Sequence, residues 1–290
     1  MKNDNLILTL GTAQDGGFPH IGCNLNCCKQ VKKNPDLGRL VASLSIVDTS
    51  KSNAWIIDVT PDINKQLRIL MEYIPDLEYP SLSGVFLTHA HIGHYIGLLY
   101  FGLEALNLKN IPVYVLPGMK NFLCNNSMFS KMIENNNIII KDLSDQTKIR
   151  LNDNLEIEPF FVPHRNELSE TVGYLIKGDS KSLLYIPDID SWEDWNINLV
   201  DIIKDNDIVI IDGTFFSKDE ITHRNIEKIP HPSIIESMSL MEKLPLKEKN
   251  KVFFTHLNHT NKALNDKSEE CNDIITTGYN ILKDKQTFRL

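Results

Sequence analysis

Three histidines within six residues follow an apolar segment that has the composition of a buried strand. They are His89, His91 and His94, in the run VFLTHAHIGH. Burying three imidazoles side by side costs desolvation free energy that only a bound partner returns, so the cluster favours a metal site over three separate core residues. Because Gly93 and a second apolar segment accompany it, the cluster is expected at a turn from a strand into a helix. Such a chain must build a rigid sheet whose edge carries this turn.

The rest of the chain alternates strand candidates with helical patterns. Strands are predicted where β-branched and aromatic residues gather between turn residues, over Leu6–Leu10, Leu44–Val47, Ala54–Asp58, Gly84–Thr88, Val113–Leu116, Leu155–Val162, Val172–Ile176, Leu183–Ile186, Ile208–Ile211 and Val252–Thr255. Apolar residues recur at helical spacing over Ile63–Tyr73, Tyr95–Leu106, Trp192–Ile203 and Ser233–Leu244. The mixture predicts an α/β (α+β) protein in which helices cover sheets. No internal repeat or Pro/Ser-rich linker divides the sequence, so we expect one domain over residues 1–290.

Acidic residues and histidines follow the predicted strands at their carboxyl ends. Besides the cluster that begins at His89, these residues are Asp58, His164, Asp188, Asp212, His256 and His259. Loops held by a rigid sheet are the usual place for ligands and catalytic groups. Six of the nine histidines lie just past a predicted strand, which is more than a scattered distribution would give. We therefore expect these side chains to gather at the edge of the sheets.

The order of these residues resembles the metallo-β-lactamase fold of metallo-hydrolases, whose signature is H-x-H-x-D-H after a strand. Asp58 matches the early structural Asp of that family, and His164 its next His-bearing motif. Asp188 matches the metal-bridging Asp, and His256 matches the final His. The resemblance runs in order over most of the chain. It implies a four-layer αβ/βα sandwich with the site at one edge, between the two sheets.

The resemblance also implies how the ligands divide between two metal ions. The implied set is His89, His91 and His164 for the first ion, His94 and His256 for the second, and Asp188 as a bridge between them. Such ions activate a water molecule and stabilise charge on an attacked phosphorus or carbonyl centre. Asp188 and His256 are therefore expected to have catalytic roles, with Asp58 supporting the ligands. Imidazole and carboxylate donors suit Zn, Mn or Fe, and their spacing does not choose among these ions.

One position departs from the family's signature. Gly93 stands where the family has the Asp between the second and third His, so the second ion loses a carboxylate ligand. The second site is then weaker, uses a substitute ligand or is empty, which leaves one or two active-site ions. The candidate substitutes are Asp212 and His231, in IIDGTFF and IPHPS. A helix-capping Asp and a solvated loop His are equally good interpretations of these two residues.

Three of the five cysteines lie close together, at Cys23, Cys27 and Cys28. An odd, tightly spaced set is a poor disulfide framework, and metal binding is the better interpretation in a chain expected to be cytoplasmic. The run LGTAQDGGFPHIGCNLNCC resembles the opening of the pyrroloquinoline-quinone biosynthesis protein B group and of the related cyclic phosphodiesterase of the phosphonate pathway. That resemblance implies a structural zinc site completed by a distant His, for which His259 is the best candidate. The alternative, that Cys27 or Cys28 is a small buried apolar residue, stays open.

Charge and hydropathy limit the partners. Thirty Lys and Arg against 38 Asp and Glu give a net charge of −8, which disfavours bulk binding of nucleic acid. We expect a small anionic substrate, attracted by bound metal ions rather than by the charge of the chain. No segment approaches the roughly 18 consecutive apolar residues of a membrane helix, and the first residues reach Gly and Asp before a signal-peptide core could form. These features predict a cytoplasmic protein without membrane contact, and a homodimer is compatible with them.

Three functions are compatible with these residues. The first is a metal-dependent hydrolase, most simply a phosphodiesterase acting on a small cyclic or nucleotide-like ester, although a carboxylic ester or lactone would serve the same water attack. The second, implied by the resemblance to the quinone-biosynthesis group, is an iron-dependent oxygenase or cofactor-biosynthesis enzyme. The third is a metal-binding module without catalysis. The complete set of His positions, together with Asp188, favours the hydrolase.

Overall fold

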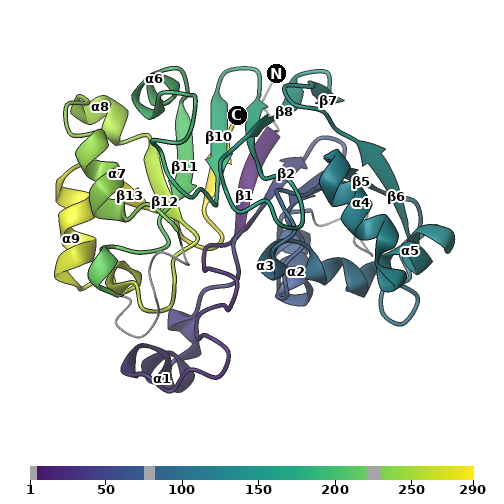
Figure 1. Cartoon of the computed structure of the whole chain (residues 1–290), viewed down its shortest axis with the longest axis horizontal. Helices are drawn as coiled ribbons and strands as arrows, with labels where there is room; N and C mark the ends of the chain where they lie inside the picture. Colours follow the sequence, from purple (N-terminus) through teal and green to yellow (C-terminus); the bar gives the residue numbers. More distant parts are fainter. Residues whose placement is uncertain (1–4, 75–81, 221–229) are drawn as a thin grey trace.

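The computed structural model describes residues 5–74, 82–220 and 230–290 of the chain. In these ranges two seven-stranded sheets pack face to face, and helices cover the outer face of each sheet (Figure 1). The four-layer sandwich implied by the resemblance is therefore confirmed. Among the described residues, no helix combines the length and apolar character needed to cross a membrane.

Each sheet is parallel on one side and antiparallel on the other. The first sheet contains, in spatial order, β14 (Thr287–Arg289), β1 (Asn5–Gly11), β2 (Ser43–Asp48), β3 (Asn53–Ile57), β4 (Leu82–Phe86), β5 (Ile111–Val115) and β6 (Ile138–Asp142). The second contains β13 (Asn280–Ile281), β12 (Val252–Thr255), β11 (Ile208–Asp212), β10 (Ser182–Ile186), β9 (Val172–Lys177), β8 (Leu155–Phe161) and β7 (Ile149–Asn152). Neighbours are parallel from β3 to β6 and from β10 to β13, and antiparallel elsewhere.

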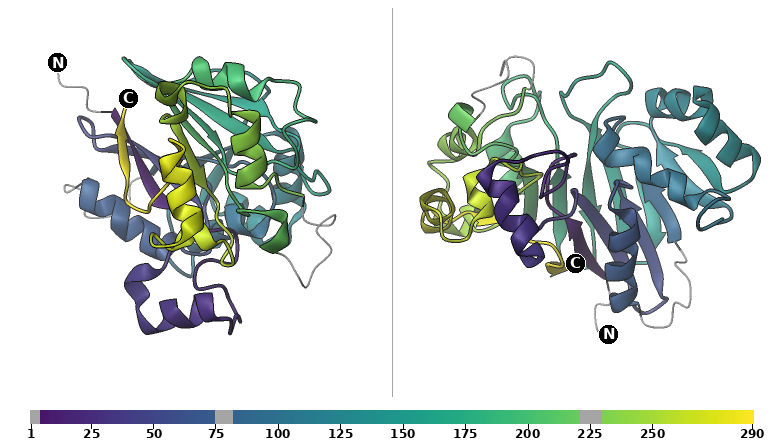
Figure 2. Two further views of the ribbon diagram at one scale, coloured as in Figure 1. Left: turned by 90° about the vertical axis from the view of Figure 1, so that its left-hand side faces the viewer. Right: turned by 90° about the horizontal axis from the view of Figure 1, so that it is seen from below.

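Helices form the two outer layers (Figure 1). Those beside the first sheet are α2 (Ile63–Tyr73), α3 (Ile92–Tyr95), α4 (Pro117–Asn125) and α5 (Ser127–Glu134). Those beside the second are α6 (Leu199–Lys204), α7 (Ile234–Leu240), α8 (Leu246–Lys249) and α9 (Glu269–Thr276). Short 3₁₀ helices are formed by Pro35–Leu37, Ile96–Phe101, Lys218–Glu220 and Lys262–Leu264. The remaining helix, α1 (Asn26–Lys33), lies outside both layers, at the lower edge of Figure 1 and of the left view of Figure 2.

Central strands place alternate residues in two different apolar layers. In β3, Trp55 and Ile57 pack between the two sheets, whereas Ala54 and Ile56 pack beneath the outer helices. The sequence of a strand that is buried on both faces is a continuous run of apolar residues. All ten strands predicted from such runs are confirmed, with ends shifted by no more than two residues.

The four strands that the sequence analysis does not predict are the outermost strands of the two sheets. They are β14 and β6 in the first sheet and β13 and β7 in the second. Each has at most five residues, and most of their residues are partly or fully exposed. An edge strand needs no continuous apolar run, so β7, β13 and β14 carry little strand pattern. The exception is β6, whose three consecutive isoleucines form such a run but are not predicted as a strand.

Two of the four helix predictions are confirmed. The helix over Ile63–Tyr73 is α2, and the one predicted over Ser233–Leu244 is the shorter α7. The helix predicted over Tyr95–Leu106 is wrong, because α3 ends at Tyr95 and a 3₁₀ segment follows. There the backbone packs so closely on a neighbouring loop that a Cβ at Gly97 would lie 2.1 Å from the Thr60 carbonyl oxygen.

The helix predicted over Trp192–Ile203 is present only in its last part, as α6. Asn198 caps the start of α6 by accepting hydrogen bonds from two backbone amides. Before that cap, Trp192 and Trp195 donate their indole N–H groups to Ser237 and Phe161 instead of facing one side of a helix. Tertiary contacts thus replace the helical pattern that these apolar residues suggest.

The strands that carry the predicted site residues end at one edge of the sandwich. In the first sheet β1, β3 and β4 point in the same direction, and in the second β8, β10, β11 and β12 do so. Asp58 directly follows β3, and Asp188 lies two residues beyond β10. The fold therefore brings loops from distant parts of the sequence to a common edge.

Candidate metal centres

The structure brings together the six side chains that the resemblance implies as active-site ligands. The ligand atoms of His89, His91 and His164 all lie within 4.8 Å of one another. His91 Nδ1 is 3.2 Å from His164 Nε2. Asp188 completes this group, with Oδ2 at 3.7 Å from His89 Nε2 and Oδ1 at 3.8 Å from His164 Nε2.

A second group shares Asp188 and contains an aspartate that the sequence analysis does not predict. Asp188 Oδ2 lies 3.0 Å from His94 Nε2 and 3.3 Å from His256 Nε2. Asp15 Oδ1 lies 3.4 Å from each of the same two nitrogen atoms. Four side chains from four different loops thus direct their ligand atoms toward one point, and Asp188 stands between the two groups.

These separations suit metal coordination. With metal–ligand distances of about 2.1 Å, the ligands of a tetrahedral ion lie about 3.4 Å apart, and the separations here range from 3.0 to 3.8 Å. Among the described residues, His89 Nε2, His94 Nε2 and Asp188 Oδ2 are buried and have no hydrogen bond. Since buried polar atoms normally have a partner, these three atoms fit a metal ion bound between them.

Outer hydrogen bonds orient the imidazoles of the first sheet. His94 Nδ1 donates to Asp58 Oδ2 at 2.7 Å, which leaves Nε2 facing the centre. Thr88 donates both its amide and its hydroxyl to Asp58, and the same hydroxyl oxygen lies 2.9 Å from His89 Nδ1. Asp58 therefore has the supporting position expected from the sequence. Such outer partners fix the orientation and tautomer of ligating histidines.

The second sheet supplies equivalent support. His164 Nδ1 donates to Asp190 Oδ1 at 2.7 Å, and the other Asp190 oxygen accepts from the backbone amide of Arg165. Thr214 Oγ1 lies 3.0 Å from His256 Nδ1. In His164 and His256, as in His94, it is Nε2 that faces the centre.

Burial sets the charge of the centre. It lowers the pKa of His89 well below the usual value and that of His91 to about 4, so both rings are neutral at physiological pH. Burial alone would raise the pKa of Asp188, but the surrounding imidazoles, that of His256 foremost, hold it well below its usual value. His94 differs: burial alone would lower its pKa, but the carboxylates around it, that of Asp58 foremost, raise it well above the usual value. Metal ligation requires neutral imidazoles and an ionised carboxylate, so an ion bound at His94 must displace a proton.

Asp212 and His231, the candidate substitutes for the missing carboxylate, pair with each other. His231 Nδ1 donates to Asp212 Oδ2 at 2.6 Å, and both side chains are buried. Burial alone would lower the pKa of His231, but the Asp212 carboxylate raises it to about 9. His231 is therefore not a solvated loop residue, and its ring lies 3.8 Å from Asp188 Oδ1.

The carboxylate next to Gly93 is that of Asp15. A Cβ placed on Gly93 would lie 2.1 Å from Asp15 Oδ1 and 2.6 Å from its Cγ. The Asp15 side chain therefore occupies the space that a side chain at position 93 would take. It reaches this place from the loop after β1, whereas Gly93 lies in α3, the short helix that follows β4.

Asp15 and Asp190 are the functional residues that the sequence analysis missed. Asp15 lies four residues past β1, and Asp190 two residues past Asp188. Both therefore follow a predicted strand, as the predicted ligands do. That shared placement is the pattern that could have identified them.

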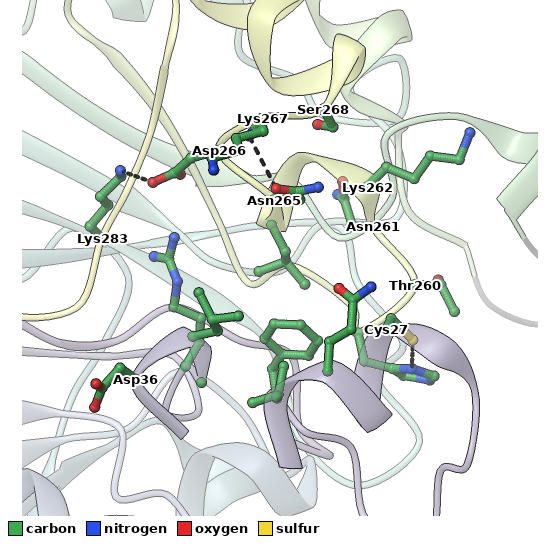
Figure 3. Close-up of a pocket in the computed structure, with 18 of the residues that line it drawn as sticks. Cys27, Asp36, Thr260, Asn261, Lys262, Asn265, Asp266, Lys267, Ser268 and Lys283 are labelled. Carbon is green, nitrogen blue, oxygen red and sulfur yellow. Dashed lines mark hydrogen bonds and ion pairs between the residues drawn. The ribbon is translucent and has the colours of Figure 1, made fainter. Parts of the chain in front are cut away.

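Two cavities lie near these groups. One of about 890 Å³ opens beside the His/Asp centre, where Asp15 and Ile92 line it. The other, of about 640 Å³, is walled in part by Cys27 and His259 (Figure 3). None of the six predicted active-site ligands lines either cavity, but Asp15, which lies 3.4 Å from His94 and His256, lines the first and not the second. The first cavity is therefore the one placed to admit a substrate to the centre.

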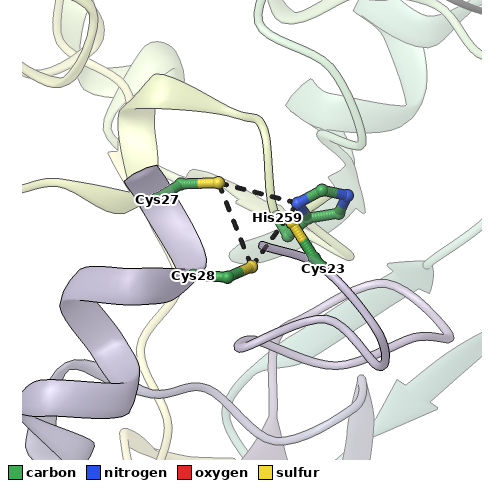
Figure 4. Close-up of side chains that lie close together, drawn as sticks. All are labelled: Cys23, Cys27, Cys28 and His259. Atoms are coloured by element: carbon green, nitrogen blue, oxygen red, sulfur yellow. Dashed lines mark hydrogen bonds between the residues drawn. The ribbon is translucent and has the colours of Figure 1, made fainter. Parts of the chain in front are cut away.

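Three cysteines and His259 converge at the start of α1 (Figure 4). Cys27 Sγ and Cys28 Sγ lie 3.9 Å apart, and they are 3.7 and 3.6 Å from His259 Nδ1. A tetrahedral zinc ion with one nitrogen ligand places its sulfur ligands about 3.8 Å apart and about 3.5 Å from the nitrogen. With Cys23, all four ligand atoms lie within 4.8 Å of one another. This convergence supports the metal interpretation of the cysteines over the apolar one.

Comparisons with known proteins extend over almost the whole chain. Coenzyme PQQ synthesis protein B of Nitrosococcus oceani is 24% identical, over 96% of this chain and 98% of that protein. Zn²⁺-bound PqqB from Methylobacterium extorquens has the same fold, with a TM-score of 0.81 and 21% identity over 98% of this chain and all of that one. A diphosphatase from the PhnP family also has this fold, with a TM-score of 0.69 and 22% identity over 98% and 96% of the two chains.

The family assignment comes from a model that covers most of the chain. Residues 54–257 match the β-lactamase superfamily domain, a range that contains all six predicted active-site ligands. Asp15 and Cys23 lie before this range. The chain therefore belongs to the β-lactamase superfamily and has the metallo-β-lactamase fold.

Proposed function

We propose that this chain is a metal-dependent hydrolase that cleaves small phosphate esters with a metal-activated water. One observation carries the proposal: Asp188 stands between two groups of imidazole nitrogens, 3.0 Å from His94 and 3.7 Å from His89. Paired metal sites of this kind recur in phosphatases and nucleases. When bound, the ions supply a nucleophilic hydroxide at neutral pH and stabilise the charge that develops on the phosphate.

The chain itself holds the donors in position and shapes the site. Asp58 and Asp190 fix the rings of His94 and His164, so the centre needs little rearrangement before it binds its ligands. The cavity of about 890 Å³ next to the centre is large enough for a nucleotide-like ester. We propose that a small anionic substrate binds in this cavity and that the enzyme is cytoplasmic. A homodimer is compatible with this proposal.

We propose that His231 gives a proton to the leaving group. Asp212 binds its Nδ1, which leaves Nε2 as the ring atom that can transfer a proton. The Asp212 carboxylate favours the protonated ring, as a general acid requires. Its ring centroid lies 5.5 Å from that of His164 and 6.0 Å from that of His256, so the donor lies beside the ligand groups.

We expect His231→Gln to separate substrates by their leaving groups. Turnover of an alkyl or nucleoside diester should fall by about 10²- to 10⁴-fold, because the leaving alkoxide needs a proton. Turnover of bis(p-nitrophenyl) phosphate should fall much less, because p-nitrophenolate leaves without one. Initial rates on both substrates, with metal content measured in parallel, test this. An equal loss on the two substrates at unchanged metal content would contradict the assignment.

The comparisons support a phosphorus centre and also a second candidate function. A diphosphatase with this fold cleaves a phosphate anhydride, which favours the hydrolase. The alternative is an iron-dependent oxygenase or cofactor-biosynthesis enzyme, and the full-length similarity to coenzyme PQQ synthesis protein B favours the cofactor-biosynthesis role.

A metal and substrate panel separates the two candidates. We expect protein loaded with Zn²⁺ or Mn²⁺ to hydrolyse bis(p-nitrophenyl) phosphate or a cyclic nucleotide. Iron-dependent oxygen consumption on a tyrosine-containing peptide, without hydrolysis under any metal, would instead support the second candidate and exclude the first.

A further inference from the structure

We propose that Asp15 is the carboxylate ligand of the second active-site ion, in place of the aspartate that the signature has at position 93. In the family signature this carboxylate belongs to position 93, which here lies in α3, whereas in this chain it comes from the loop after β1. The inference rests on the metal-dependent function proposed above and concerns the residues that make its second site.

Two distances place Asp15 in the coordination position. Its Oδ1 lies 3.4 Å from His94 Nε2 and 3.4 Å from His256 Nε2. That value matches the edge of a tetrahedron around an ion with ligands at about 2.1 Å. Asp188 Oδ2 is a fourth donor near the same two nitrogens, at 3.0 and 3.3 Å from them.

Gly93 is what makes this arrangement possible. The Cβ that any other residue would place there meets Asp15 at 2.1 Å from Oδ1 and 2.9 Å from Cα. An aspartate at position 93 and the observed Asp15 carboxylate would thus compete for the same space. The backbone at Gly93 is not in the left-handed region, so it is this close approach, and not an unusual φ, that requires glycine.

The backbone fixes Asp15 relative to the other ligands. Gln14 donates its amide to the Leu257 carbonyl at 3.0 Å, and Leu257 donates its own to the Thr12 carbonyl at 2.9 Å. The residues directly before Asp15 and directly after His256 are therefore held together. Because of this pairing, the two ligands approach the ion from adjacent, mutually bonded segments.

A simple ion pair between Asp15 and a protonated His94 is the competing explanation. It would use the same atoms but would not change how many ions the protein binds. Metal stoichiometry distinguishes the two explanations, because only a ligand changes the count.

The test is the metal content of the full-length protein after loading with Zn²⁺ and removal of free ion. We expect three ions per chain in the wild type and two in Asp15→Ala and Asp15→Asn. Affinity for the lost ion should fall at least as much as the roughly 10- to 100-fold that loss of an outer partner causes. Asp36→Asn, which removes an exposed carboxylate from a neighbouring turn, is the matched control and should keep three.

The double variant Asp15→Gly/Gly93→Asp tests the exchange directly. Removing the Asp15 side chain frees the space, so the new aspartate should restore the third ion that Asp15→Gly alone lacks. Three ions in Asp15→Asn, with thermal unfolding like that of the wild type, would overturn the inference. So would a double variant that binds no more metal than Asp15→Gly.

These outcomes are independent of the proposed reaction. A wild type that binds three ions, loses one in Asp15→Asn and hydrolyses no ester would overturn the proposed function and leave the ligand assignment standing. An active hydrolase whose Asp15→Asn variant keeps all three ions would do the reverse.

Discussion

Replacing Asp188 with alanine should reduce phosphodiester hydrolysis by about 10³-fold or more while the fold survives. Asp188 faces ligands of both groups, at 3.0 Å from His94 Nε2 and 3.8 Å from His164 Nε2. Its loss removes a negative ligand from both sites at once. The stabilisation of transition-state charge that bound metal ions supply, which is several kcal/mol, should then be disturbed. Each ~1.4 kcal/mol is a factor of ten in rate.

The measurement is kcat/KM for bis(p-nitrophenyl) phosphate with metal in excess, alongside circular dichroism. Asp142→Ala is the matched control, because Asp142 is an exposed carboxylate that pairs only with Lys120 among the described residues. The control should retain wild-type activity. Turnover near the wild-type rate in Asp188→Ala would contradict a catalytic role for the His/Asp centre.

Replacing Cys23 with serine should release one zinc ion per chain and lower the melting temperature. The four ligands join α1 and its loop to the segment that follows β12, so the ion crosslinks parts of the chain that are distant in sequence. Structural zinc sites contribute folding free energy directly. A loss of a few kcal/mol in a chain of this size corresponds to a fall in Tm on the order of 5 °C or more.

Cys23 is the informative position because it is only half-buried, so its substitution tests ligation more than packing. His259→Ala should have the same effect on zinc. Cys124→Ser is the matched control, since Cys124 is exposed and belongs to no metal-binding group among the described residues. Zinc content by mass spectrometry and thermal unfolding report the result, and full retention of zinc in Cys23→Ser would exclude the assignment.

The fold was predictable where burial leaves a pattern in the sequence. Strands such as β3 and β11 are buried on both faces, and their apolar runs identify them. The edge strand β7 and the segment before α6 lack such a pattern, because exposure or tertiary contacts determine their conformation. Apolar patterns in the sequence therefore predict the central strands of this sandwich better than its edge strands and connecting segments.

The site was predictable as far as its ligands follow the strands in the family's order. Asp15 also follows a strand, but its contact with Gly93 was not predictable, because the two segments are far apart in sequence and meet only in the folded chain. Asp190 was missed since its role depends on the direction of the His164 ring. Similarly, the pairing of Asp212 with His231 appears only when two separate loops are brought together.

The central claim is that the His/Asp centre, and not the cysteine group, performs a metal-dependent hydrolysis. The most direct test follows bis(p-nitrophenyl) phosphate hydrolysis by the wild type while Zn²⁺ or Mn²⁺ is added to chelator-treated protein that retains its structural ion. We expect no hydrolysis before addition and a rate that rises until two further ions are bound per chain. Hydrolysis that persists without those ions, or none when both are bound, would contradict it.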